Sequence, residues 1–148
     1  MKLAFASDHR GYKLKEELVK YYDTKVETID CGTYNDISCD YPDYAFKLGK
    51  IVATKNADFG VAICGTGIGI SIACNKVKGI RCAKIDNEEE AKITRKDNDS
   101  NIVALNENLD AKTAIKIIDS FINTKASNEE KHVRRINKIT KYEEEHER

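Results

Sequence analysis

Short apolar runs alternate with amphipathic stretches along the chain. An apolar run predicts a buried strand, because a strand covered on both faces is apolar at nearly every position. Five such runs lie at residues 3–6, 26–29, 59–63, 80–85 and 101–105. Between them, apolar residues recur every three or four positions, as in a helix with one buried face. The alternation predicts an α/β fold: a three-layer sandwich around a five-stranded parallel sheet with right-handed crossovers.

Two helix starts carry capping signals. Asp110 precedes the most regular helical pattern, which contains Ala114, Ile117, Ile118, Phe121 and Ile122. Asp86, followed three residues later by Glu89, resembles a capping box at the start of the preceding helix.

The segment after the third run is ambiguous. Ile68, Ile70 and Ile72 alternate with small residues, and this period of two is typical of a strand. We nevertheless favour a helix, because a strand would require a turn within the glycines. Small residues at Gly69 and Ala73 would also let a helix pack closely beneath the preceding loop.

The last part of the chain differs in character. Residues 128–148 are highly charged, yet Val133, Ile136 and Ile139 recur at three-residue spacing. This pattern predicts a C-terminal extending helix over about residues 128–146 that packs on a second subunit. No internal repeat or low-complexity linker occurs, so we expect a single domain over residues 1–148.

Charge and cysteine content narrow the function classes. Lys plus Arg and Asp plus Glu each number 25, so no net charge attracts nucleic acid or an anionic membrane. The sequence shows neither a stretch apolar enough for a membrane span nor a signal peptide, which predicts a cytoplasmic protein. The five cysteines form no C-x-x-C pair, which favours reduced thiols and no metal site. They are Cys31, Cys39, Cys64, Cys74 and Cys82.

Cys64 is the candidate reactive group. It ends the third apolar run and precedes Gly65, Gly67 and Gly69, so a thiol lies beside a loop of backbone N–H groups at a helix start. Such a setting favours a thiolate, and the N–H groups could bind an anion. An inert buried thiol remains the alternative.

Nucleotide-binding motifs fit this loop poorly. Asp86 follows at the distance of a ribose-binding acid, but Ile70 occupies the place of the third glycine of a dinucleotide fingerprint. The motif also follows the third strand instead of the first. A Walker A loop is excluded because no Gly-Lys-Ser or Gly-Lys-Thr occurs.

Other polar groups could join Cys64. Asp8 and His9 follow the first strand, at the same sheet edge, although a helix cap and a surface histidine are the simpler readings. A polar cluster at residues 95–101 could equally be a capped turn. Lys131, Arg135 and Lys138 share one helical face, which could bind phosphate or simply face solvent.

Motifs spread over nearly the whole chain resemble those of type B ribose-5-phosphate isomerases, a family that includes allose- and galactose-6-phosphate isomerases. The matching segments are Ser7-Asp8-His9-Arg10-Gly11-Tyr12, Asp40-Tyr41-Pro42, residues 63–73, Asn75-Lys76, Gly79-Ile80-Arg81 and Asn98-Asp99. The resemblance implies a Rossmann-like sheet and a cofactor-independent aldose–ketose isomerase of a sugar phosphate. It also implies a homodimer, possibly pairing into a tetramer, with active sites across the interface.

The resemblance also implies residue roles. Cys64 would be the base that moves a proton through a cis-enediolate, and Thr66 would assist by donating a hydrogen bond or shuttling a proton. Backbone N–H groups would stabilise the negative oxygen, from Gly65, Gly67, Ile68 and Gly69. Asp8, His9 and Asn98 would bind the sugar, and Lys131 with Arg135 would bind its phosphate.

Three positions depart from the family pattern. Asp97 stands where the family has a histidine that opens the sugar ring, so ring opening would be slower or use another group. Asn108 and Lys131 each replace an arginine, and Arg134 is a candidate replacement for the phosphate-binding charge lost at Asn108. A six-carbon sugar phosphate as substrate, or a binding protein whose catalysis has decayed, therefore remain as alternatives.

Overall fold

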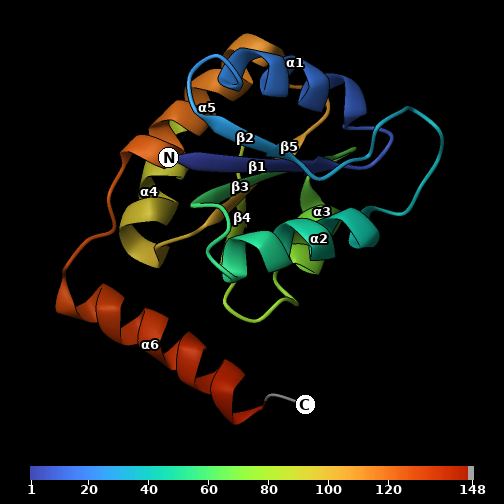
Figure 1. Cartoon of the computed structure of the whole chain (residues 1–148). Coiled ribbons are helices and arrows are strands. Elements are labelled where there is room, and N and C mark those ends of the chain that lie inside the picture. The colour runs from blue at the N-terminus through green and yellow to red at the C-terminus, as the bar shows by residue number, and fades with distance from the viewer. Residues whose placement is uncertain (147–148) are drawn as a thin grey trace.

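The computed structural model describes residues 1–146, and its centre is one parallel sheet (Figure 1). The strands are β1 (Lys2–Ser7), β2 (Glu27–Asp30), β3 (Phe59–Cys64), β4 (Cys82–Lys84) and β5 (Ile102–Asn106). They lie in the order β2-β1-β3-β5-β4, with every neighbouring pair parallel. The predicted five-stranded parallel sheet is confirmed, although β4 is shorter than the apolar run suggested.

Helices cover both faces of the sheet. The helices α1 (Tyr12–Tyr22), α4 (Glu88–Asn98) and α5 (Ala111–Asn123) cover one face, and α2 (Tyr41–Ala53) and α3 (Ile68–Cys74) cover the other. Because strand side chains alternate between faces, each face has its own core. The predicted three-layer sandwich is confirmed.

The two cores differ in side-chain size. Larger residues of the central strands face α1, α4 and α5: Leu3, Phe5, Val61, Ile63 and Leu105. Small residues of the same strands face α2 and α3: Ala4, Ala6, Ala62, Cys64 and Ala104. Small side chains let a helix axis approach a sheet closely. Because alanines line this face, α3 can pack against the sheet directly after the end of β3.

The ambiguous glycine segment is a helix, as favoured. Gly69 of α3 lies under the ring of Tyr41, and a Cβ atom at Gly69 would be only 2.7 Å from Tyr41 Cζ. Ile70 is fully buried, whereas Ile68 and Ile72 are 53% and 57% exposed. The strand-like period arises because apolar residues occupy the outward positions of this helix as well as the inward one.

The predicted capping box at Asp86 and Glu89 is wrong by one residue. Asn87 caps α4 by accepting the Glu90 N–H at 2.9 Å, and the Glu90 carboxylate accepts the Asp86 N–H at 2.8 Å. Asp86 instead pairs with Lys84 at 2.7 Å. At α5 the prediction is confirmed, because Asp110 accepts the Thr113 N–H at 2.7 Å, and the hydrogen bonds from Thr113 lower the pKa of Asp110.

The C-terminal helix, α6 (Glu130–Glu145), projects from the sandwich. None of its residues is buried. Two hydrogen bonds connect it to the sandwich. The Ser127 N–H, just before α6, donates to Lys96 O, and the Gly79 N–H donates to the Glu143 carboxylate. The extending helix is confirmed, with slightly narrower bounds. Within residues 1–146, the structure has no helix that is both long and apolar enough to cross a membrane.

A buried ion pair holds the end of β2. Lys15 of α1 has a fully buried side chain, and its Nζ lies 2.8 Å from both carboxylate oxygens of Asp30. Asp30 also accepts the Gly32 N–H at 2.9 Å, at the start of the loop that leads to α2. The pair therefore anchors both α1 and this loop.

We expect Asp30→Asn to lower the free energy of unfolding by about 3 kcal/mol, because the buried Lys15 ammonium then keeps only Glu16, a half-exposed carboxylate 2.9 Å away, as its counter-ion. Urea denaturation measures this change. Glu27→Gln is the matched control on the same strand: its pair with Lys2 is solvent-exposed, so the cost should stay below about 1 kcal/mol. Equal losses in the free energy of unfolding for the two variants would show that the pair of Lys15 with Asp30 stabilises the fold no more than an exposed pair does.

Candidate active site

Asp8 and Cys64 lie at the point where the strand order of the sheet reverses. After β1 the chain crosses to β2 on one side, whereas after β3 it crosses to β4 and β5 on the other. The carboxyl ends of β1 and β3 are neighbours, and connections that leave in opposite directions open a crevice between them. Cys64 ends β3, and Asp8 directly follows β1.

The Cys64 thiol has a backbone donor. Its Sγ accepts a hydrogen bond from the Gly67 N–H at 3.2 Å, and the residue is almost completely buried. Gly67 has φ +79°, and a Cβ atom there would lie 2.9 Å from the carbonyl carbon of Leu105. Only glycine fits both constraints. The glycine loop thus directs a backbone N–H at the sulfur.

A second N–H of the loop is also engaged. The Ile68 N–H donates to Thr66 Oγ1 at 3.1 Å, which leaves the Thr66 hydroxyl proton able to donate elsewhere. The next N–H groups, of Gly69 and Ile70, belong to the first turn of α3, where no acceptor exists within the helix. The sequence predicted a row of available N–H donors, but those of Gly67 and Ile68 already serve Cys64 and Thr66.

Asp8 and His9 are fixed by backbone groups. One carboxylate oxygen of Asp8 accepts the N–H groups of Arg10 and Gly11, at 2.9 and 3.0 Å, in the turn that precedes α1. His9 Nδ1 accepts the Cys39 N–H at 3.2 Å. The neutral imidazole must therefore carry its proton on Nε2, so His9 can offer a donor to a ligand.

An ion pair that the sequence did not reveal lies beside Gly65. Arg10 Nε is 2.7 Å from Glu107 Oε2, and the hydrogen bond and charge of Glu107 raise the pKa of Arg10. A Cβ atom at Gly65 would lie 3.2 Å from the same carboxylate oxygen. Asn108 follows at this edge, where its N–H donates to Asn106 Oδ1 at 2.9 Å and its side chain is exposed.

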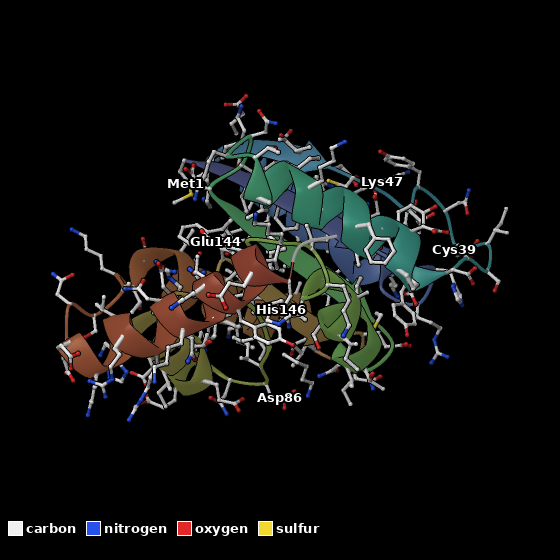
Figure 2. The ribbon with its side chains drawn as sticks, turned by 90° about the horizontal axis from the view of Figure 1, so that it is seen from below. Met1, Cys39, Lys47, Asp86, Glu144 and His146 are labelled. Carbon is white, nitrogen blue, oxygen red and sulfur yellow. The ribbon has the colours of Figure 1, made fainter. Side chains whose placement is uncertain are left out.

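The other candidate residues lie at the opposite end of the sheet. Helix α4 begins after β4, at the edge where Cys64 lies, and runs back, so its last residues Asp97 and Asn98 reach the edge where the strands begin. In Figure 2 Met1 marks that end and Cys39 the other. The first turns of α6, which contain Lys131 and Arg135, lie near the end of α4. The Ser127 N–H, just before α6, donates a hydrogen bond to Lys96 O of α4.

Two arginines and a histidine contact the end of α4. Arg81 donates to the backbone oxygens of Asn98 and Asp99, and Arg95 pairs with the Asp99 carboxylate at 2.8 Å. Asn98 Oδ1 accepts the Thr94 hydroxyl at 3.1 Å. Asp97 lies 3.5 Å from His132 Nε2. The end of α4 is therefore held in place, with the side chains of Asp97 and Asn98 beside α6.

A single chain separates the predicted residues into two groups. Those at the carboxyl edge of the sheet are Asp8, His9, Cys64, Gly65, Thr66, Gly67, Ile68, Gly69 and Asn108. Those at the other end are Asp97, Asn98, Lys131 and Arg135. Arg134, the candidate replacement for the charge missing at Asn108, is in this second group and pairs with Glu130.

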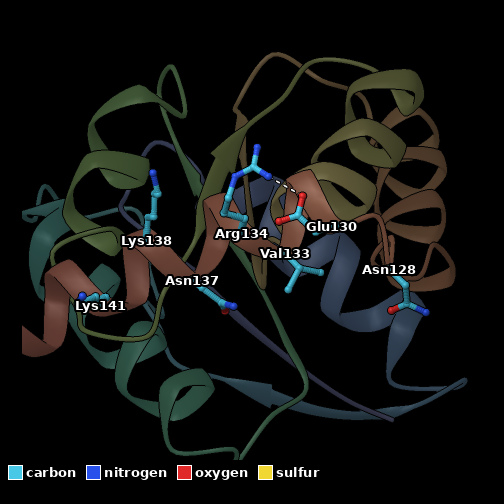
Figure 3. A pocket seen from close by; sticks show the side chains of 7 residues that line it. All are labelled: Asn128, Glu130, Val133, Arg134, Asn137, Lys138 and Lys141. Carbon is cyan, nitrogen blue, oxygen red and sulfur yellow. Dashed lines mark hydrogen bonds and ion pairs between the residues drawn. The ribbon is translucent and has the colours of Figure 1, made fainter.

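One cavity lies along α6. It is an open groove of about 620 Å³ (Figure 3), lined by Asn128, Glu130, Val133, Arg134, Asn137, Lys138 and Lys141. A second pocket of about 390 Å³ lies against the body and includes Asn98, Arg81 and Ile139. Both cavities adjoin the second group of residues.

Two of the other cysteines are unsuited to acid–base chemistry. Burial raises the pKa of Cys31 to about 11, and a hydrogen bond with Cys74 raises the pKa of Cys82. Such thiols stay protonated at neutral pH. Within residues 1–146, the structure has no group of three or more His, Cys, Asp or Glu side chains that could hold a metal ion.

The fold is an open α/β sheet with a thiol where the strand order reverses, and enzymes with such sheets commonly bind ligands at the carboxyl edge. Comparison with known proteins gives the family. Residues 3–139 match the model of the Ribose/Galactose Isomerase family. The chain belongs to this family and is an isomerase.

Individual relatives cover nearly the whole chain. A Bacillus subtilis protein with the provisional name sugar phosphate isomerase YwlF is 43% identical over 97% of this chain and 98% of its own. The structure of Clostridium thermocellum ribose-5-phosphate isomerase B superposes with a TM-score of 0.93, at 39% identity over 98% of this chain and 99% of that one. Ribose-5-phosphate isomerase B from Mycoplasma genitalium, solved with bound ribulose-5-phosphate, has a TM-score of 0.90 at 36% identity, covering 97% of each chain.

Gly67→Ala tests the geometry around Cys64. A left-handed residue other than glycine costs about 1–2 kcal/mol, and the contact with the Leu105 carbonyl should add about 1–3 kcal/mol of strain. Gly79→Ala is the matched control, with φ +88° but its nearest neighbour, Ala53 Cβ, at 3.7 Å. Urea unfolding should show the larger loss for Gly67→Ala, and equal losses would contradict the close approach to Leu105.

Proposed function

We propose that this protein interconverts ribose 5-phosphate and ribulose 5-phosphate as a homodimer, in the cytoplasm and as part of the pentose phosphate pathway. The observation that carries the proposal is the hydrogen bond from the Gly67 N–H to Cys64 Sγ, at the sheet edge that also holds Asp8 and His9. Relatives named ribose-5-phosphate isomerase B, one with bound ribulose-5-phosphate, support the choice of substrate.

In this proposal Cys64 is the base of the reaction. Its thiolate removes the proton from C2 of the open-chain aldose, and the electrons move onto the carbonyl oxygen to form a cis-enediolate. The proton of the C2 hydroxyl passes to the C1 oxygen, by way of the Thr66 hydroxyl. The thiol then returns its own proton to C1 while the C2 carbonyl forms, which yields the ketose and restores the thiolate. The Thr66 hydroxyl and the N–H groups at the start of α3 stabilise the charge on the oxygen.

Asp8 and His9 bind the sugar in this scheme. The fixed Nε2–H of His9 donates to a sugar oxygen, and the second carboxylate oxygen of Asp8 accepts from a hydroxyl. Both side chains are held by backbone groups before the substrate arrives, so little ordering is needed on binding.

We infer that the partner subunit supplies the second group of residues. One chain places Asp97, Asn98, Lys131 and Arg135 at the far end of its own sheet, so a second chain is the simplest source of a phosphate site beside Cys64. Exposed apolar residues suit such a partner: Ile68 and Ile72 on α3, and Val133 and Ile139 on α6. The partner's Lys131 and Arg135 would bind the phosphate by charge-assisted hydrogen bonds.

A direct assay tests the reaction. We expect purified protein to form ribulose 5-phosphate from ribose 5-phosphate, faster than it converts allose 6-phosphate or galactose 6-phosphate. Binding of ribose 5-phosphate without turnover would contradict the enzyme proposal. A preference for a six-carbon substrate would contradict only the choice of sugar.

Cys64→Ala should reduce turnover by at least about a hundredfold while substrate binding is retained, because it removes the base but not the sugar contacts. Turnover is followed by product formation and binding by calorimetry. Cys39→Ser is the control: it keeps the backbone N–H that binds His9. Undiminished turnover of Cys64→Ala would remove Cys64 from the role of base.

Complementation tests the shared site. Cys64→Ala and Arg135→Ala dimers should each be impaired, but dimers formed from both chains contain one intact site. With random pairing, about a quarter of the wild-type kcat/KM should return, because half the dimers are mixed and each has one working site of two. No recovery in verified mixed dimers would place the two residues in the same chain's site.

A further inference from the structure

A histidine of α6 faces the aspartate at the end of α4. His132 Nε2 lies 3.5 Å from Asp97 Oδ1 and 3.5 Å from Glu129 Oε2. Its side chain is only 13% exposed, whereas that of Asp97 is 44% exposed. We propose that His132, oriented by Asp97, is the acid–base group that opens the furanose ring of the substrate; this inference rests on the isomerase function proposed above.

Ring opening needs a group that both accepts and donates a proton. In the cyclic form of ribose 5-phosphate the C1 hydroxyl must lose its proton as the carbonyl forms. The bond from C1 to the ring oxygen breaks, and that oxygen must gain a proton. One imidazole can take the first proton and supply the second, so that atoms and charge balance. Histidine is the side chain that most often performs such paired proton transfers in enzymes.

The carboxylates determine which ring nitrogen is the base. Asp97 and Glu129 both approach Nε2, so the proton of the neutral imidazole resides there. This leaves Nδ1, which contacts no hydrogen-bond partner within residues 1–146, with its lone pair available to the substrate hydroxyl. Asp97 then stabilises the imidazolium that forms when Nδ1 takes the proton. Asp97 is thus a positioning residue and His132 the catalytic one.

The surroundings of His132 suit this role. Lys131 and Arg135, the residues proposed to bind phosphate, lie on the same two turns of α6, and Asn98 adjoins Asp97. The end of α4 is held by Arg81, which donates to Asn98 O at 2.8 Å, and by the Ser127 N–H, which donates to Lys96 O at 3.0 Å. The imidazole and its carboxylate therefore belong to the group that one subunit would present to the other's Cys64.

The other histidines are less suited. His9 Nδ1 accepts the Cys39 N–H, and no carboxylate pairs with its ring within residues 1–146. His146 stacks on Tyr142 near the end of α6, and its Nδ1 contacts the Tyr142 carbonyl oxygen at 2.9 Å. Neither has a carboxylate to stabilise its imidazolium.

The test uses the fact that ribulose 5-phosphate cannot close to a furanose, since its C5 oxygen carries the phosphate. Exchange of its C1 hydrogen with deuterated water therefore requires the Cys64 step but no ring opening. For His132→Gln we expect turnover of ribose 5-phosphate to fall by about a hundredfold or more, with exchange into ribulose 5-phosphate retained. Asp97→Asn should show the same split to a smaller extent.

The control variant and the opposing results separate the two proposals. His146→Gln should retain both turnover and exchange. If His132→Gln loses turnover and exchange equally, or loses neither, the ring-opening role is overturned. If the wild-type protein neither converts ribose 5-phosphate nor exchanges ribulose 5-phosphate, the proposed function itself fails. Retained exchange in His132→Gln also shows that the variant is folded and assembled.

Discussion

The direction of the strands is the constraint on which the rest of the molecule depends. All five are parallel, so every strand ends at one edge and the helices between strands return the chain to the other. Residues that follow strands, such as Asp8 and Cys64, therefore gather at one edge. Residues at the ends of the returning helices, such as Asp97 and Asn98 of α4, gather at the other. No adjustment of side chains can bring these two groups together within one chain.

Close packing on one face of the sheet then determines the backbone geometry beside Cys64, at the carboxyl edge. The alanines of β1, β3 and β5 leave room for α3 directly after β3. Gly67 makes the turn between them without a side chain, against the carbonyl of Leu105. The same turn directs its N–H at the Cys64 sulfur. One short segment thus determines both the turn between β3 and α3 and the placing of a donor at the sulfur.

Local patterns in the sequence predicted most of this architecture. The strands, the order of helices, the helical conformation of the glycine segment and the cap at Asp110 all depend on residues near each other in the chain. The prediction placed the capping box at α4 one residue too early, because Asp86 and Asn87 are both residue types that cap helices. In the structure Asp86 pairs with Lys84, and Asn87 is the residue that caps α4. The placing of the candidate residues Asp8, His9 and Cys64 at the carboxyl edge followed from their positions after strands.

Contacts between distant segments could not be predicted. The pairs of Arg10 with Glu107, Lys15 with Asp30 and Asp97 with His132 join residues on different elements, and nothing in the local pattern of any of them signals a partner. Asp97 illustrates the consequence. In the sequence Asp97 occupies the position at which the family has a histidine. In the fold His132, from another helix, lies beside Asp97.

The crystal structure of the Cys64→Ser protein with ribose 5-phosphate bound would test the central claim, that the reaction needs both ends of the sheet from two chains. The account predicts C2 of the sugar beside Ser at position 64 of one chain, with the phosphate bound by the partner's Lys131 and Arg135. A phosphate bound only by residues of the chain that holds C2 would contradict it.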